Sequence, residues 1–263
     1  MSTKKQKIGI SLSGGSAMGY AHLGLLQAVE EAGYKPDCVV GTSMGAIMGM
    51  MYAAGYKPLE IKKIIKDEKM DSAIRIAFPN VPKPGGFVST IRIQRILKKY
   101  VPDNSFDKLQ TKFYCCTSNM ETLQAEYHGQ GDNLVEYVMA SAAMPGVFSP
   151  VKVNGVNLVD GGIHDHLPVK PLLDEKCDIR IGSNLLVEKP GKKKLSQLWI
   201  HAFLYCSFSN YHLTAGQFTD LINIDPGKYW LSDFKAVNEL FEIGYNTGKT
   251  YFKNSKSKIQ NPK

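Results

Sequence analysis

The chain has 263 residues, 43% of them hydrophobic, and a formal net charge of +8. This length fits one large domain or two small ones with a sizeable core, and no run approaches the roughly 18 apolar residues of a membrane span. The positive charge favours anionic partners such as phospholipid head groups. The absence of an RNP motif, a zinc finger or a basic recognition helix argues against nucleic acid.

Two β-α units are predicted for the first part of the chain. A strand at 8–13 leads into a glycine-rich turn at 14–19 and a helix at 20–31. A second strand at 37–41 leads into a helix at 46–54 that is rich in small and apolar residues. This order with short loops is typical of a parallel sheet covered by helices.

The rest of the chain continues the mixture of strands and helices without an internal repeat. We predict an α/β fold of three layers, α/β/α, with a mainly parallel central sheet. It forms a single domain over 1–263, with its core motifs at 7–190 and a C-terminal strand and helices at 191–253. The further elements predicted are a short helix at 58–66, a loop rich in Pro and Gly at 78–87, a basic amphipathic helix at 90–100 that fits either surface packing or contact with lipid, strands at 112–119 and 123–127, a helix at 133–143, a hairpin at 151–160, a strand at 178–187, a helix at 195–210, a strand at 221–225 and a closing helix at 234–252.

The cysteines and the ends of the chain carry few further signals. Five cysteines lie scattered without a C-x-x-C or metal-ligand spacing, which is typical of reduced, buried thiols. The basic start leads into a short apolar run, Ile8 to Leu12, which we interpret as a strand and not as a signal peptide. A lysine cluster at 189–194 and a polar tail at 254–263 hold part of the excess charge. We expect a cytoplasmic protein without metal or cofactor, whose charge is compatible with peripheral contact at an anionic membrane.

The strongest chemical signal is the G-x-S-x-G pentapeptide from Gly41 to Gly45, set between a predicted strand and a predicted helix. A serine on such a sharp turn has its hydroxyl exposed at the end of a sheet. Gly41 and Gly45 allow the chain to turn tightly and the helix to lie close to the strand. Ser43 is therefore a candidate nucleophile, with Gly41 and Gly45 forming its elbow.

A second signal is the glycine-rich turn from Gly14 to Gly19, which joins a strand to the start of a helix. Free N–H groups and the helix dipole favour negative charge at such a place, so Gly14, Gly15 and Ser16 are candidates for an oxyanion hole. A P-loop would need Lys and Ser or Thr after Gly19, where Tyr and Ala stand. A dinucleotide fingerprint would need a different glycine spacing.

The base that would activate Ser43 is either a histidine or a carboxylate. A Ser-His-Asp order can be built from Ser43, Asp160 and either His201 or His212, but the nucleophile strand of that fold comes mid-sheet and here is only the second. Asp160 ends a predicted strand and precedes two glycines. A carboxylate held against the serine in a partly desolvated site can take its proton directly.

Taken together, these segments resemble the patatin-like phospholipase family over most of residues 7 to 190. The family has a glycine-rich oxyanion loop, a G-x-S-x-G elbow and a D-G-[GA] motif in this order, which match 14–19, 41–45 and 160–162 here. The segment at 141–148 is also similar to a helix end common in bacterial members. The resemblance implies a Ser43–Asp160 dyad that forms an acyl-enzyme and cleaves lipid esters, with Gly14, Gly15 and Ser16 binding the oxyanion.

The sequence departs from the family pattern in two places. Ser16 and Met18 stand where a glycine and an arginine are usual, from which we expect backbone strain at Ser16 and weaker activity or less polar substrates through Met18. The residues at 164–166 stand where members often have asparagine, and we interpret them as hydrogen-bonding loop residues. We expect the substrate pocket to be formed by the 67–86 segment and the 195–210 helix. Two alternatives stay open, a non-enzymatic lipid-binding or regulatory protein and a Ser-His-Asp esterase.

Overall fold

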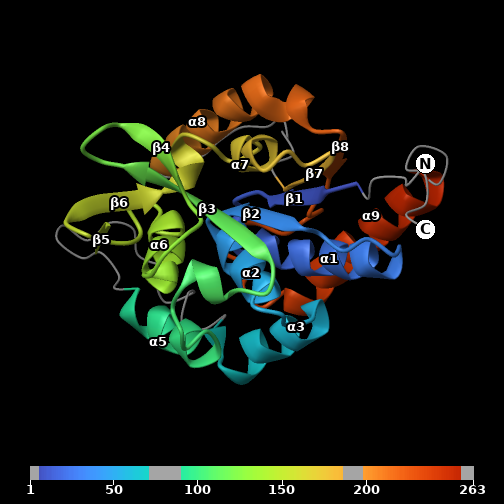
Figure 1. Cartoon of the computed structure of the whole chain (residues 1–263), viewed down its shortest axis with the longest axis horizontal. Coiled ribbons are helices and arrows are strands. Elements are labelled where there is room, and N and C mark those ends of the chain that lie inside the picture. Colours follow the sequence, from blue (N-terminus) through green and yellow to red (C-terminus); the bar gives the residue numbers. More distant parts are fainter. Residues whose placement is uncertain (1–5, 71–89, 186–197, 256–263) are drawn as a thin grey trace.

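A single mixed sheet organises the computed structural model, which describes residues 6–70, 90–185 and 198–255 apart from the side chains of 198, 199, 208 and 255. Within these residues the sheet has eight strands in the order β5-β6-β3-β2-β1-β7-β8, with β4 paired to β3 (Figure 1). Parallel pairing joins β1 (Ile8–Leu12), β2 (Cys38–Thr42), β3 (Lys112–Asn119), β7 (Ile179–Asn184) and β8 (Asp220–Asn223). Antiparallel pairing adds β4 (Gln124–His128), β5 (Val151–Val153) and β6 (Val156–Asp160).

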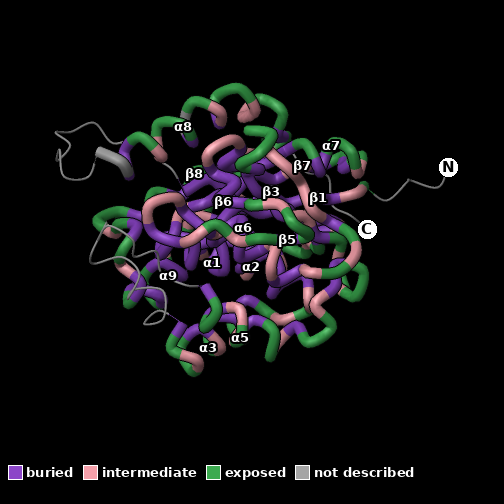
Figure 2. Tube along the Cα trace, turned by 90° about the vertical axis from the view of Figure 1, so that its left-hand side faces the viewer, coloured by how far each residue is buried: buried purple, intermediate pink, exposed green. Residues whose placement is uncertain are grey.

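Helices cover both faces of the sheet, so the three-layer arrangement predicted from the sequence is confirmed (Figure 1). Val39 of β2 belongs to the main hydrophobic core, whereas its neighbours Cys38 and Val40 pack in a second core on the opposite face. The strands at the centre are buried and the outer sides of α3, α5 and α8 are exposed (Figure 2). The helices are α1 (Tyr20–Glu31), α2 (Met44–Ala53), α3 (Pro58–Asp67), α5 (Ile91–Tyr100), α6 (Leu134–Ser141), α7 (Lys170–Asp174), α8 (Leu198–Thr214) and α9 (Val237–Ser255), with short 3-10 turns η1 (Ser16–Gly19), η2 (Phe106–Lys108), η3 (Gly161–Ile163) and η5 (Ala215–Gln217).

The predicted elements agree with the structure in kind and, in most cases, to within a few residues. The helix predicted at 195–210 extends to Thr214, and the closing helix begins at Val237 rather than at 234. The short helix α7, which has a proline in its first turn, is not among the predicted elements. The predicted loop at 78–87 and the lysine cluster at 189–194 lie outside the described residues. No described helix combines the length and apolar character that a membrane span requires.

The register along β3 brings two distant parts of the chain together. Thr42, the last residue of β2, pairs with Cys116, and the next residue of β3, Thr117, pairs with Asp160 of β6. β4 pairs with one edge of β3 over these same residues. β2 and β6 therefore both pair with the opposite edge of β3, one after the other. β2 runs parallel to β3 and β6 runs antiparallel, so their carboxyl ends meet.

Close contact between α1 and α9 depends on two glycines that face the opposite backbone. A Cβ atom on Gly24 of α1 would lie 1.9 Å from the carbonyl oxygen of Phe241, and a Cβ on Gly244 of α9 would lie 1.9 Å from that of Ala21. Backbone atoms cannot move aside as a flexible side chain can. The crossing of these helices therefore fixes α1, which follows the glycine-rich turn directly.

We expect Gly24→Ala to force α1 and α9 apart and to lower the free energy of unfolding by roughly 1–3 kcal/mol. Chemical denaturation measures the change. Gly216→Ala is the matched control, because the position is exposed and no heavy atom lies within 4 Å of the added methyl group. Equal stability of the two variants would contradict the importance of this crossing.

Candidate active site

Ser43 stands on the sharp turn between β2 and α2 that the sequence predicts. Its backbone has φ 55° and ψ −124°, a conformation that costs a non-glycine residue about 1–3 kcal/mol. A Cβ on Gly41 would lie 2.4 Å from the Gly45 carbonyl oxygen, and one on Gly45 would lie 2.3 Å from the carbonyl oxygen of Leu12. Both glycines are thus required by close backbone approach, and they hold Ser43 at the carboxyl end of β2.

The strained turn is supported by Ser141, a residue for which the sequence analysis assigned no role. The backbone N–H of Ser43 donates to Ser141 Oγ at 2.9 Å, and Ser141 is fully buried at the end of α6. The resemblance of the 141–148 segment to a family helix end was the only sequence signal for it. This bond satisfies a buried donor that the turn leaves outside the helix.

Asp160 lies directly against Ser43, because β6 ends where β2 ends. The Ser43 hydroxyl donates to Asp160 Oδ2 at 2.7 Å, and the N–H of Gly162 donates to Oδ1 at 2.8 Å. The backbone N–H of Asp160 donates to the Ala143 carbonyl at 3.1 Å, and Ser118 Oγ donates to the Asp160 carbonyl at 2.9 Å. Each carboxylate oxygen of Asp160 therefore accepts one hydrogen bond, and the backbone of the residue is held by two more.

Burial gives this carboxyl group an unusual proton affinity. Asp160 has no exposed surface, and desolvation raises its pKa from 3.8 to about 7, although the bonds from Gly162 and Ser43 act in the opposite direction. A side chain with a pKa near neutrality can both accept and return a proton at physiological pH. The arrangement can therefore remove the proton from Ser43 without an intervening imidazole.

The glycine-rich turn lies beside Ser43, but its three candidate amides are not equivalent. The N–H of Gly14 donates to the His166 carbonyl at 3.1 Å, which revises the prediction that this amide faces a ligand. The N–H groups of Gly15 and Ser16 have no acceptor among the described residues. Ser16 has φ 49°, the positive value that we expected to cause strain. Met18 is buried in the main core and lines neither of the cavities described below.

The histidines are not placed as a Ser-His-Asp triad requires. An imidazole cannot stand between Ser43 and Asp160, which already share a hydrogen bond. His201 is buried on α8 and His212 is exposed on the same helix, and neither lines the cavities next to Ser43. His166 does line one of them, which the sequence analysis did not foresee.

The other two residues of the 164–166 segment form hydrogen bonds, as the sequence analysis predicted, and their partners lie on β3 and β4. His164 Nδ1 lies 2.8 Å from Ser118 Oγ. The Asp165 carboxylate accepts from the Tyr127 hydroxyl at 2.7 Å, and burial raises the pKa of Asp165 to about 6. Both residues stabilise the turn that follows Asp160.

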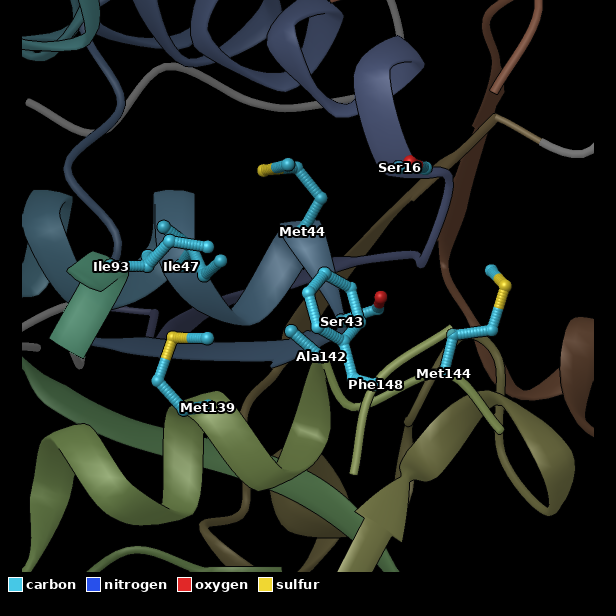
Figure 3. Close-up of a pocket in the computed structure, with 9 residues that line it drawn as sticks. All are labelled: Ser16, Ser43, Met44, Ile47, Ile93, Met139, Ala142, Met144 and Phe148. Carbon is cyan, nitrogen blue, oxygen red and sulfur yellow. The ribbon is translucent and has the colours of Figure 1, made fainter. Parts of the chain in front are cut away.

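Two cavities open next to Ser43. The first is narrow, with a free volume of about 30 Å³, and its lining is mainly apolar. Figure 3 shows Ile47, Ile93 and Met139 grouped to one side of Ser43. This lining comes from α2, α5 and α6, which the sequence analysis did not predict.

The second cavity lies between the glycine-rich turn and α8, which contributes Phe203, Leu204 and Ser207. The 195–210 helix, which the sequence analysis expects to help to form the substrate pocket, thus lines this cavity, whereas most of the 67–86 segment lies outside the described residues. Among the described residues, no group of three or more His, Cys, Asp and Glu side chains is placed to hold a metal ion.

Comparison with known proteins identifies relatives of this chain. A family model described as patatin-like phospholipase matches residues 10–173. The lysophospholipase nte1 of Emericella nidulans is 28% identical over 281 residues, which cover 95% of this chain and 18% of the relative. The lysophospholipase NTE1 of Candida glabrata is 32% identical over 277 residues, which cover 94% of this chain and 16% of the relative. This chain thus spans less than a fifth of the length of these curated relatives.

A solved structure shares the fold at low sequence identity. The crystal structure of VipD from Legionella pneumophila superposes with a TM-score of 0.60 and 14% identity, over 96% of this chain and 67% of that chain. Such a likeness supports the arrangement of strands and helices, and it carries no information on substrate.

The raised pKa of Asp160 predicts a pH-dependent effect of Asp160→Asn on stability. Because the folded pKa lies near 7 and the unfolded value near 3.8, folding favours the protonated acid, and stability from this group is lost as the pH rises through about 7. An asparagine at position 160 does not ionise and therefore does not lose stability in this way. We expect Asp160→Asn to raise the melting temperature above that of the parent by several degrees more at pH 8 than at pH 4. An equal difference at both pH values would contradict the desolvated carboxylate.

Proposed function

This chain belongs to the patatin-like phospholipase family, and on that premise we propose that it is a serine acyl hydrolase that cleaves carboxylic esters of lipids. The observation that carries the proposal is the 2.7 Å hydrogen bond from the Ser43 hydroxyl to a fully buried Asp160 carboxylate. The apolar cavity beside Ser43 supports an acyl chain as the bound group. A phospholipase A or lysophospholipase type of substrate fits both features.

In the first half of the reaction, Ser43 Oγ attacks the ester carbonyl carbon while its proton moves to Asp160. The negative charge that develops on the carbonyl oxygen is stabilised by the N–H groups of Gly15 and Ser16. Gly14 supports these donors by holding the turn against the His166 carbonyl. When the C–O bond to the alcohol breaks, Asp160 returns the proton to the leaving alkoxide, and an acyl-enzyme remains on Ser43.

In the second half, a water molecule attacks the acyl carbonyl carbon and gives a proton to Asp160. The bond to Ser43 Oγ then breaks, the proton returns to this oxygen, and a fatty acid leaves. The pKa of about 7 suits both transfers, because the group is partly ionised at neutral pH. The ionised fraction, and with it the rate of acylation, increases with pH through this value.

The hydrogen bond between Ser43 and Asp160 disfavours both alternative functions, the lipid-binding protein and the Ser-His-Asp esterase. A lipid-binding or regulatory protein would have no need for a strained nucleophile paired to a desolvated base, because both features cost stability. A Ser-His-Asp esterase would need an imidazole at a position that the direct Ser43–Asp160 bond occupies.

The dyad predicts which substitutions abolish the reaction. We expect Ser43→Ala and Asp160→Asn to lower kcat/KM for p-nitrophenyl esters by at least about a thousandfold, and Ser43→Ala to remove labelling by a fluorophosphonate probe. His201→Ala and His212→Ala serve as controls that retain activity. Loss of activity in either histidine variant supports the esterase, and failure of the parent to react with the probe supports the lipid-binding protein.

The apolar cavity predicts selectivity for acyl length. Ile93 of α5 lines this cavity, whereas Ile96 on the same helix does not. We expect Ile93→Trp to shorten the cavity and to lower the ratio of kcat/KM for p-nitrophenyl decanoate over butyrate by about tenfold or more. Ile96→Trp is the matched control. An unchanged ratio in Ile93→Trp would place the acyl chain elsewhere.

We also propose peripheral contact with a lipid surface through the outer side of α8. This helix has no Asp, Glu, Lys or Arg in its 17 residues, and Tyr205 and Leu213 are 61% and 77% exposed. Ser207 and Asn210 of α8 donate to carbonyls of η3, the turn that follows Asp160. In α5, the apolar residues Ile93 and Leu97 are buried, and Ile91 is the one large apolar side chain of this helix that is exposed.

Co-sedimentation with vesicles of phosphatidylcholine and phosphatidylserine tests this surface. We expect Tyr205→Glu combined with Leu213→Glu to reduce binding while hydrolysis of a soluble ester is retained, because an exposed charge opposes insertion. The control replaces Arg92 and Arg95 of α5 by Gln. Reduced binding only in the control would assign the contact to α5.

A further inference from the structure

His22 is a buried titratable residue to which the proposed reaction gives no role. It is the third residue of α1, it has no exposed surface, and both of its ring nitrogens have a partner. Nε2 lies 2.9 Å from the carbonyl oxygen of Ser13, the residue after β1, and Nδ1 lies 2.8 Å from Ser183 Oγ on β7. One ring thus joins α1 to the carboxyl ends of two neighbouring strands.

The partners of the ring determine where its proton lies. A carbonyl oxygen can only accept a hydrogen bond, so His22 Nε2 donates to Ser13. Burial lowers the pKa of His22 to about 4, so the ring is neutral at physiological pH and carries only this proton. Nδ1 therefore has a lone pair, to which the Ser183 hydroxyl donates. The ring is a neutral donor to the Ser13 carbonyl, held in place from its other side.

The Ser13 carbonyl belongs to the peptide group that leads into the glycine-rich turn. The N–H of the same peptide group, which is that of Gly14, donates to the His166 carbonyl at 3.1 Å. The two polar groups of a trans peptide point in opposite directions. The plane of this peptide group is therefore set from two sides, by His22 of α1 and by the segment that follows Asp160.

This peptide group lies against the nucleophile elbow. A Cβ atom on Gly45 would lie 2.5 Å from the Ser13 carbonyl oxygen, which shows how closely the elbow approaches it. A Cβ atom on Gly14 would lie 3.5 Å from Ser43 Cβ. The bond from His22 thus acts on a part of the backbone that is packed next to the reacting serine.

The next two amides are the donors assigned above to the oxyanion. The N–H groups of Gly15 and Ser16 have no acceptor among the described residues, and Ser16 has φ 49°. A backbone in this region persists only where its surroundings determine it. Because the two amides follow the Ser13 carbonyl directly, a rotation of that peptide group would turn them away from Ser43.

We propose that His22 is a positioning residue for acyl transfer, which holds the Ser13 carbonyl through Nε2–H so that the amides of Gly15 and Ser16 face the developing oxyanion. This role rests on the acyl hydrolase activity proposed above. His22 does not touch the ester and exchanges no proton. Its hydrogen bond exists before the substrate binds, so the two donors need not reorganise when the carbonyl oxygen becomes charged. Loss of the bond weakens binding of the oxyanion, whereas binding of the uncharged acyl chain is unchanged.

Two amide variants separate donation to Ser13 from the mere presence of a polar side chain. In His22→Gln the amide nitrogen reaches the position of Nε2 and can donate to Ser13, whereas in His22→Asn the amide reaches only the position of Nδ1. Leu26→Ala, which removes a fully buried side chain one turn further along α1, is the control for lost packing. Chemical denaturation checks that each variant is folded under the assay conditions.

Two inhibitors distinguish the charged oxygen from the acyl chain. Decyl trifluoromethyl ketone is attacked by Ser43 Oγ at its carbonyl carbon, the serine proton moves to Asp160, and the carbonyl oxygen becomes an oxyanion. p-Nitrophenyl decyl ether presents an alkyl chain of the same length without a carbonyl group. Inhibition constants for both compounds are measured against hydrolysis of p-nitrophenyl decanoate.

We expect His22→Asn to lower kcat/KM for the decanoate ester by about tenfold or more and to weaken binding of the ketone by a similar factor, while affinity for the ether changes by less than about twofold. His22→Gln is expected to recover most of both losses, and Leu26→Ala to retain the parental kinetics. Parental kinetics in His22→Asn, equal weakening of the ketone and the ether, or no recovery in His22→Gln would each overturn the proposal.

The position of the proton is tested in the parent protein, so this measurement stands even where His22→Asn fails to fold. Nitrogen NMR of histidine-labelled protein, assigned with variants of the other histidines, is expected to show a neutral His22 ring protonated at Nε2 at neutral pH. A proton on Nδ1 would overturn the proposal. A parent that neither hydrolyses the ester nor binds the ketone would instead refute the acyl hydrolase activity.

Discussion

The structure depends on the meeting of β2 and β6 end to end along one edge of β3. Thr42 and Asp160 pair with the consecutive residues Cys116 and Thr117, and this register brings Ser43 within hydrogen-bond distance of a carboxylate that is 117 residues away in the chain. A shift of one residue in the β3–β6 pairing would turn Asp160 to the other face of the sheet. The antiparallel hairpin at the edge of a parallel sheet is thus the element that creates the dyad.

The site combines several features that oppose folding. Ser43 and Ser16 have positive φ values, Asp160 is buried away from solvent, and His166 Nε2 has no hydrogen-bond partner among the described residues. Each feature is maintained by the surrounding contacts. Ser141 accepts a hydrogen bond from the backbone N–H of Ser43, and Gly162 donates one to the Asp160 carboxylate. Such concentration of strain and desolvation in one place is typical of functional sites. The stability comes from the packed layers on either side of the sheet.

Local patterns found the parts of the site that depend on short-range chemistry. The elbow at Ser43, the glycine-rich turn and the end of the Asp160 strand were all predicted, because turn residues and hydrophobic periodicity act over a few positions. The sequence did not reveal Ser141 as the support of Ser43, the engagement of the Gly14 amide by His166, or the α5 and α6 lining of the cavity. These are contacts between segments far apart in the chain, on which no local pattern bears.

The sequence by itself determined the order of the elements, the layers of the fold and the residue types at the reacting centre. These follow from spacing and from the steric needs of glycine, which any stretch of chain carries with it. Only the tertiary structure decided that Asp160 rather than a histidine touches Ser43, that its pKa is close to 7, and that His166 faces the same cavity. Strand register and desolvation arise only when distant segments pack and exclude water, so they cannot be read from any one of those segments.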